Sequence, residues 1–103
     1  MARLKIRVIC TFAVGTSVLL IANLKNFLDE RKVKAFVDID AVTALDARGT
    51  ECDIIVTEPS FEHLLPEISA KKVIVVDDFS DIDKMKKGLI DALKELEIPF
   101  ENP

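Results

Sequence analysis

The chain opens with a short run in which apolar and basic side chains alternate. This alternation covers residues 4–8, and Ile9 and Cys10 follow directly. A period of two residues is typical of a β-strand with one buried face. Over residues 17–30 the period changes to that of an α-helix with one apolar stripe. The stripe consists of Leu20, Ile21, Leu24, Phe27 and Leu28. The pattern therefore predicts a strand that enters a buried sheet, followed by a long helix.

The next part of the chain repeats this change of period on a shorter scale. Residues 34–39 alternate again and predict a second strand, with Asp38 and Asp40 marking its end. Residues 41–48 have a spacing compatible with a helix. Gly49 suits the C-cap of that helix because glycine adopts the left-handed conformation without strain. We therefore expect a second strand and a short second helix.

Two further strands are predicted in the second half of the chain. Residues 53–57 are apolar on both faces, as central strands of parallel sheets usually are. Residues 72–76 form a similar apolar run. Pro59 and Pro66 interrupt regular structure in between, so we expect a loop there.

The last helix has the clearest pattern. Ser80 with Asp83 three residues later resembles a capping box, with Asp in place of Glu. Apolar residues then recur on one helical face up to Pro99, which cannot continue a helix. This face consists of Ile82, Met85, Leu89, Ile90, Leu93 and Leu96.

Strands that alternate with helices predict an α/β fold of the Rossmann-like type. We expect a single domain over residues 1–103, a three-layer sandwich with helices on both faces of a four-stranded parallel sheet of strand order 2-1-3-4. In such sheets the functional site lies beyond the carboxyl ends of the strands, near the first strand, where Cys10 stands. Cys52 falls at the opposite end of its strand, roughly 15 Å or more away. A disulfide needs Cα atoms within about 7 Å, so both thiols should stay free.

Composition restricts the classes of function. Half of the 103 residues are apolar, which suffices for the core of one domain. The net charge of −4 does not suit a phosphate backbone, so nucleic acid is not an expected partner. The longest apolar run, residues 18–22, is far shorter than the ~20 residues of a membrane span. We therefore expect a cytoplasmic protein without direct membrane insertion.

The segment between the first strand and the long helix carries the candidate chemistry. Cys10 is followed by five residues and then by the hydroxyl pair Thr16 and Ser17. Five residues can curl the backbone around an oxyanion, and the first N–H groups of a helix lie at the positive end of its dipole. Both effects stabilise a thiolate, so the pKa of Cys10 should fall below the free value of about 8.5. The predicted phosphate-binding loop consists of Thr11, Phe12, Ala13, Val14, Gly15, Thr16 and Ser17.

Purely structural interpretations of these residues stay open. A cysteine at the end of a buried strand is often a small core residue, and Thr16 and Ser17 can act as helix caps alone. Phe12 either anchors partners at the loop tip or folds back onto the core. The coincidence of strand end, glycine, hydroxyl pair and helix start within eight residues favours a functional Cys10.

At these residues the chain resembles the enzyme IIB family of sugar phosphotransferase systems, within the lactose/cellobiose-type superfamily and in particular its galactitol and ascorbate branches. The family pattern is a basic strand, then Cys-Gly-x-Gly-x-(Ala/Gly)-(Thr/Ser)-Ser, then a long helix. The matching residues are Cys10, Gly15, Thr16 and Ser17. Thr11 and Ala13 stand where the family commonly has glycine. The resemblance extends over nearly the whole chain.

The resemblance implies a phosphotransferase that relays a phosphoryl group. The thiolate of Cys10 would attack the phosphohistidine of an enzyme IIA partner. The phosphocysteine would then pass the group to a sugar held by the membrane enzyme IIC. The resemblance implies neither a metal nor another cofactor, and Cys10, Cys52 and His63 lack the spacing of metal ligands.

Two other functions fit parts of the pattern. Low-molecular-weight tyrosine phosphatases use a Cys-x5-Arg-(Ser/Thr) loop, but Thr16 stands at the arginine position, which removes the main phosphate clamp. Asp77 or Asp78 would supply the general acid of such an enzyme, although a solvated loop is the simpler interpretation. The second alternative is a non-catalytic IIB-like module that senses phosphorylation. Glu58 is expected at the rim of the site without a catalytic role, since a carboxylate would repel a phosphoryl group, and His63 is expected at the surface.

Overall fold

Four parallel strands form one sheet in the computed structural model, which describes residues 2–10, 16–76 and 82–101. The strands are β1 (Ala2–Cys10), β2 (Ala35–Thr43), β3 (Glu51–Thr57) and β4 (Ser69–Val75). Their order in the sheet is β2-β1-β3-β4, and every neighbouring pair is parallel. The predicted fold class and strand order are confirmed.

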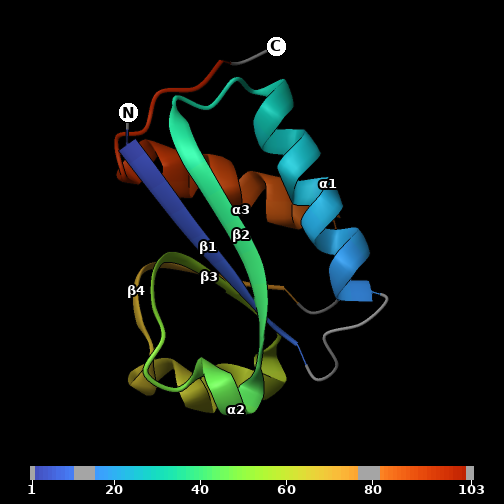
Figure 1. Ribbon diagram of the computed structural model, residues 1–103, viewed down its shortest axis with the longest axis vertical. Helices are drawn as coiled ribbons and strands as arrows, with labels where there is room; N and C mark the ends of the chain where they lie inside the picture. Colours follow the sequence, from blue (N-terminus) through green and yellow to red (C-terminus); the bar gives the residue numbers. More distant parts are fainter. Residues whose placement is uncertain (1, 11–15, 77–81, 102–103) are drawn as a thin grey trace.

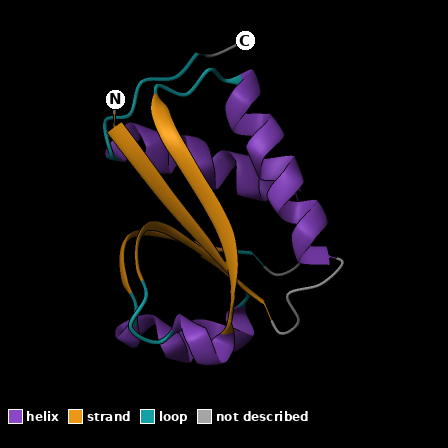
Figure 2. Cartoon of the chain, in the orientation of Figure 1, coloured by secondary structure: helices purple, strands orange, loops and turns teal. Residues whose placement is uncertain are grey.

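Helices cover both faces of this sheet (Figures 1 and 2). The long helices α1 (Thr16–Glu30) and α3 (Ile82–Glu95) lie on one face. The short helix α2 (Ala44–Ala47) and the 3-10 helix η1 (Pro59–Glu67) cover part of the other face. The two faces are therefore covered unequally.

The larger core lies between the sheet and the two long helices. It contains alternate residues of the strands and the apolar stripes that the sequence pattern predicted for α1 and α3. Its fully or almost fully buried side chains include Leu4, Ile6, Val8, Leu20, Leu24, Ile54, Met85, Leu89 and Leu93. Burial of this apolar surface is the main favourable term that holds the helices on the sheet.

The smaller core lies on the opposite face, under α2 and η1. It consists of Ile9, Ala47, Cys52, Ile55 and Leu64. On β1 only the carboxyl end takes part in it, since Arg3, Lys5 and Arg7 occupy the same face nearer the amino end. The alternation of basic and apolar residues at the start of the chain therefore reflects a strand with one fully buried face and one half-covered face.

The second strand is longer than its sequence pattern predicts. Asp38 and Asp40 do not end β2, which continues to Thr43, so the predicted helix over 41–48 shrinks to α2. Pairing with β1 accounts for the greater length of β2. The two strands pair without a break, from the pair Ala2–Ala35 to the pair Cys10–Thr43. The backbone hydrogen bonds of this ladder outweigh the weak helical preference of three residues.

The acidic residues of β2 are held by neighbours in the sheet. Asp38 forms an ion pair with Arg7 of β1, with Nη1–Oδ1 and Nη2–Oδ2 distances of 3.3 and 3.2 Å. The hydrogen bond from Arg7 lowers the pKa of Asp38, and burial opposes this only in part. Asp40 instead accepts a hydrogen bond from the N–H of Ala41 at 2.8 Å. Both carboxylates therefore lie within the strand and stabilise it.

One further boundary differs from the sequence prediction, and two others agree with it. The stretch after β3, predicted as a loop, forms η1, with Pro59 in its first turn. Gly49 has a φ of 80° after α2, as a helix C-terminus requires. At the other end of the chain α3 stops before Pro99, because Glu97 takes a φ of 59° and the N–H of Ile98 bonds to the carbonyl of Leu93.

A segment after α3 is tied back to the turn between α1 and β2. The N–H of Lys34 donates to the carbonyl of Pro99 at 2.8 Å, and the N–H of Glu101 donates to the carbonyl of Arg31. Ile98 is buried in the larger core. Segments that are some 65 positions apart in the sequence therefore meet near the amino ends of β1 and β2 (Figure 1).

Two leucines of α1 allow a matched test of the larger core. Leu24 is 1 % exposed and Leu19 is 65 % exposed. We expect Leu24→Ala to lower the free energy of unfolding by about 2–5 kcal/mol, because it leaves a cavity under the helix. The same change at Leu19 should cost less than about 0.5 kcal/mol. Urea unfolding followed by circular dichroism compares the two, and equal losses would contradict the assigned burial.

The pair of Arg7 and Asp38 predicts a pH-dependent contribution to stability. The pKa of Asp38 is lowered in the folded protein, so its stabilisation is present above the unfolded value of about 3.9 and is lost as pH falls through the folded value. Since Asp38 is 45 % exposed, solvent screening limits the effect at pH 7 to about 1 kcal/mol or less. The stability difference between wild type and Asp38→Asn should therefore shrink between pH 6 and pH 3. Asp91→Asn on α3 is the control, and a gap that does not change with pH would disprove the role of the carboxylate.

Candidate functional site

Cys10 is the last residue of β1, an interior strand that lies between β2 and β3. The chain leaves β1 toward β2 on one side and later returns to form β3 on the other side. Between two such strands the crossovers diverge, which opens a crevice at the carboxyl ends where parallel α/β proteins bind their ligands. The backbone of Cys10 therefore lies where this fold class places its functional site.

Helix α1 begins at Thr16, so its amino end is connected to the end of β1 by five residues. Its first turn contains no acidic residue. The unpaired N–H groups and the positive end of the dipole of this 15-residue helix are therefore not neutralised by a carboxylate of that turn. An anion held near the end of β1 would be stabilised by this helix.

The rest of the predicted loop is placed only in part. Residues 11–15, which include Phe12 and Gly15, lie outside the described residues, and so does the side chain of Cys10. Thr16 and Ser17 are described only as backbone of the first turn of α1. The predicted cradle from Thr11 to Ser17 and the lowered pKa of Cys10 therefore stay predictions.

Two threonines end the strands on either side of Cys10, and the sequence interpretation did not single them out. Thr43 is the register partner of Cys10 on β2, and its Oγ1 accepts the N–H of Asp46 at 3.2 Å, which caps α2. Thr57 ends β3 and is fully buried, and its hydroxyl donates to the carbonyl of Glu58 at 3.1 Å. The signal in the sequence that could have identified them is a threonine at the end of each of these two strands.

These threonines hold the ends of the strands on either side of β1. The carbonyl of Thr57 accepts the N–H of Val76 at 2.9 Å, which links the ends of β3 and β4. Because Val8 pairs with Val56, Thr57 lies level with the residue that precedes Cys10. Both hydroxyls are occupied by local hydrogen bonds, so their described role is to fix the strand ends around Cys10.

Of the other candidate residues in the described part of the chain, Glu58 lies near the carboxyl end of β1, because it directly follows Thr57. Glu58 is half-buried just past β3, at the N-cap of η1, and makes no side-chain cap bond. His63 is exposed on η1, as predicted. Asp77 and Asp78, the acids required by the phosphatase alternative, fall in the range 77–81, which is not described.

Cys52 lies at the opposite end of the sheet from Cys10. Since Val8 pairs with Val56, Cys10 and Cys52 are separated by about six residue levels, or roughly 20 Å. Cys52 is a free thiol of the smaller core and is 9 % exposed. Burial raises its pKa, which the positive charge of Arg7 opposes only in part. A buried, protonated thiol is a poor nucleophile, so Cys52 is structural.

No cluster of three His, Cys, Asp or Glu side chains in ranges 2–10, 16–76 and 82–101 could hold a metal ion. Over the same ranges, no helix has the length and apolar character that crossing a membrane requires.

Comparison with known proteins assigns the chain to a family. No curated protein sequence matches it significantly. The family model described as PTS system, Lactose/Cellobiose specific IIB subunit, matches residues 5–90. The matched range contains all four strands except the first three residues of β1, as well as Cys10 and the start of α1. Because this match covers most of the 103 residues, the chain belongs to the family of IIB subunits and is a phosphoryl-transfer component of a sugar phosphotransferase system.

Proposed function

We propose that Cys10 carries a phosphoryl group from a phosphohistidine of enzyme IIA to a sugar bound by the membrane enzyme IIC. The observation that supports this most directly is the position of Cys10 at the carboxyl end of the interior strand β1, with α1 beginning six residues later. In a chain of the IIB family, this is the cysteine that lies at the switch point of the sheet.

The first step needs a thiolate. Helix α1 supplies positive potential near the end of β1, and its first turn has no carboxylate to cancel it. We propose that this potential and the backbone N–H groups of residues 11–17 lower the pKa of Cys10 and hold the phosphoryl oxygens. The hydroxyls of Thr16 and Ser17 would add hydrogen bonds to the same oxygens.

In the transfer itself, the sulfur of Cys10 attacks phosphorus in line with the phosphorus–nitrogen bond of the donor. The sulfur–phosphorus bond forms as the bond to the histidine breaks, and the electron pair of that bond stays on the ring nitrogen. A sugar hydroxyl then attacks phosphorus and gives its proton to water or to a base of the membrane partner, while the sulfur–phosphorus bond breaks and its electron pair stays on the sulfur of Cys10. Both steps depend on positioning and charge stabilisation rather than on a protein acid.

The residue at position 16 favours a carrier over a hydrolase. A phosphatase with this loop spacing uses an arginine there to clamp the transition state for attack by water, whereas this chain has Thr16. A phosphocysteine in a carrier must instead survive until its acceptor arrives. We propose that Thr16 contributes to this lifetime by leaving the phosphoryl group without a bidentate clamp.

We further propose that residues 1–103 act as one IIB domain in the cytoplasm, without inserting into the membrane. The matches to the loop pattern at Cys10, Gly15, Thr16 and Ser17 support the galactitol and ascorbate branches of the superfamily. Thr11 and Ala13 depart from that pattern. The sugar itself is chosen chiefly by the membrane partner.

Transfer from a matching phosphorylated IIA is the direct test. We expect intact-protein mass spectrometry to show a gain of one phosphoryl group, with fragmentation placing it on Cys10. The gain should be absent in Cys10→Ser and unchanged in Cys52→Ser, because Cys52 is buried at the other end of the sheet. Labelling of His63, or no labelling by any IIA tested, would count against the relay.

The same variants separate the carrier from the phosphatase alternative. Hydrolysis of p-nitrophenyl phosphate should be at background level in the wild type. Turnover that disappears in Cys10→Ser would instead assign the chain to hydrolysis.

The reactivity of the two thiols offers a test that needs no partner. We expect iodoacetamide at pH 7 to alkylate Cys10 at least about tenfold faster than Cys52, because only the thiolate reacts and burial keeps Cys52 protonated. The fast phase should be lost in Cys10→Ser and kept in Cys52→Ser. Mass spectrometry of quenched samples gives both rates, and equal rates would show that the pKa of Cys10 is not lowered.

A further inference from the structure

The two most exposed large apolar side chains of the described residues flank the carboxyl end of β1. Leu45 of α2 is 82 % exposed, and Leu19 in the first turn of α1 is 65 % exposed. Helix α2 starts directly after Thr43, which is level with Cys10. Figure 1 shows that α1 starts, and α2 lies, at the end of the sheet where β1 finishes. The two leucines therefore lie on opposite faces of the sheet at the same edge.

The side chain of Leu19 leans toward this edge. Side chains of an α-helix are tilted toward its amino end, and the amino end of α1 is the end connected to Cys10. Leu20 and Leu24 take the buried side of the helix, which leaves Leu19 on the solvent side. Leu19 is therefore available to a molecule that approaches the end of β1.

The surface that carries these leucines is also free of charge. Residues 8–24 contain no charged side chain, and residues 41–45 contain none either, although 31 % of the chain is charged. Ala22, one helical turn after Leu19, is exposed as well. The solvent side of a surface helix normally carries charged or strongly polar residues. Leu19, Ala22 and Leu45 thus form an uncharged rim beside the end of β1.

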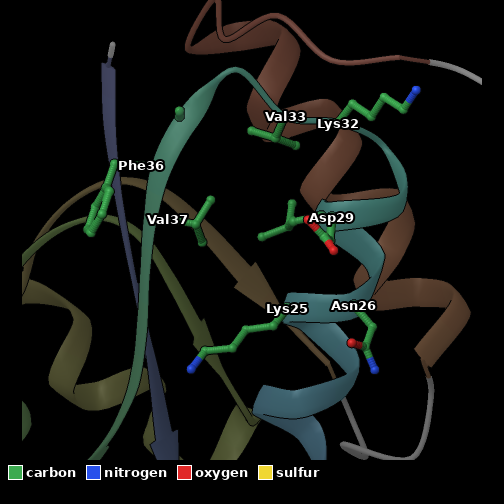
Figure 3. A pocket seen from close by; sticks show the side chains of 9 residues that line it. Lys25, Asn26, Asp29, Lys32, Val33, Phe36 and Val37 are labelled. Atoms are coloured by element: carbon green, nitrogen blue, oxygen red, sulfur yellow. The ribbon is translucent and has the colours of Figure 1, made fainter.

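Charge returns with distance from this edge. Figure 3 shows Lys25, Asp29 and Lys32 along and just after the carboxyl half of α1, where they line a hollow of about 420 Å³ between α1 and β2. The other long helix on the same face, α3, has exposed charged residues from its first turn, beginning with Asp83 and Lys84. The loss of charge is therefore confined to the part of the surface nearest the end of β1.

We propose that the uncharged rim is the docking surface for the IIA protein that donates the phosphoryl group, with Leu19 and Leu45 as apolar anchors on either face of the sheet. This inference rests on the proposed function, because Cys10 must meet a donor. The cores of protein–protein interfaces are depleted of charged residues, and an exposed leucine that becomes buried in a contact gains the free energy of apolar burial. The surface of IIA around its phosphohistidine should accordingly be apolar and poor in charge.

Other occupants fit the uncharged rim less well. Cytoplasmic loops of membrane proteins carry an excess of Lys and Arg, so a surface shaped for IIC would present carboxylates to them. Anionic lipid headgroups would instead require Lys or Arg on this chain. A second copy bound to the rim would cover the end of β1 and block access to Cys10. The absence of both signs of charge from the rim therefore favours the donor protein.

Binding of an unphosphorylated IIA from the same phosphotransferase system to the full chain tests the surface without any transfer. We expect isothermal titration calorimetry to show binding that the double variant Leu19→Ser, Leu45→Ser weakens roughly tenfold or more. The matched control is Phe36→Ser, because Phe36 is 62 % exposed but lies near the amino end of β2. This control should bind like the wild type. Circular dichroism should show the wild-type fold in each variant, since all three side chains are exposed.

A second variant adds a charge to the rim and leaves both leucines in place. Ala22→Arg should also weaken binding, because the contact would then bury an unpaired charge. Alkylation of Cys10 by iodoacetamide should keep its wild-type rate in all of these variants, since the rim acts on the partner and not on the thiol. A slower rate together with weaker binding would show a disturbed site and overturn the assignment to docking.

The outcomes separate the docking surface from the relay. Weakened binding in the double variant, with no phosphoryl gain on Cys10 of the wild type, would support the surface and reject the relay. Wild-type affinity in the double variant, equal weakening by Phe36→Ser, or no binding of any IIA tested would overturn the surface. Unchanged IIA binding with slower transfer to sugar in vesicles that contain IIC would assign the rim to the membrane partner instead. A wild-type dimer in sedimentation equilibrium that the double variant dissociates would assign it to a second copy.

Discussion

The placement of β1 between two parallel neighbours is the constraint on which the rest of this structure depends. A strand bonded along both edges has its unpaired backbone groups at its ends, and in parallel α/β proteins the carboxyl end is where ligands bind. Cys10 occupies that end, and Thr43 and Thr57 close the neighbouring strands beside it. Leu4, Ile6, Val8 and Ile9 of β1 are fully buried, so the strand that ends at Cys10 is held in the packed core.

The same constraint accounts for the separation of chemistry and structure between the two cysteines. At the carboxyl end, a helix begins shortly after the strand, and its dipole favours an anion. At the amino end, Cys52 is enclosed by the smaller core, where burial favours the neutral thiol. The two cysteines thus stand in different surroundings because they lie at opposite ends of parallel strands. The range matched by the IIB family model contains both positions.

Periodicity in the sequence was enough to predict the parallel sheet, its strand order and the long helices, because the buried stripes of β1, α1 and α3 are complete. It failed where tertiary contacts decide the local conformation. Asp38 resembles a strand end until its partner Arg7 is known, and residues 41–43 are extended only because β1 continues beside them. The 3-10 helix η1 was missed because two prolines usually indicate a loop. Of the site, the position of Cys10 was predictable, whereas the role of Thr43 depends on a pairing that spans 33 positions of the sequence.

The bonds that tie residues 99 and 101 to the turn after α1 have a consequence for the order in which the protein is made. Arg31 and Lys34 are synthesised at least 65 residues before Glu101 and Pro99, the residues to which their backbone groups are hydrogen-bonded. During synthesis the first strand–helix–strand unit must therefore expose the buried place that Ile98 later fills. The larger core can therefore be completed only after residues 98–101 have been synthesised, and until then part of its apolar surface stays open to water.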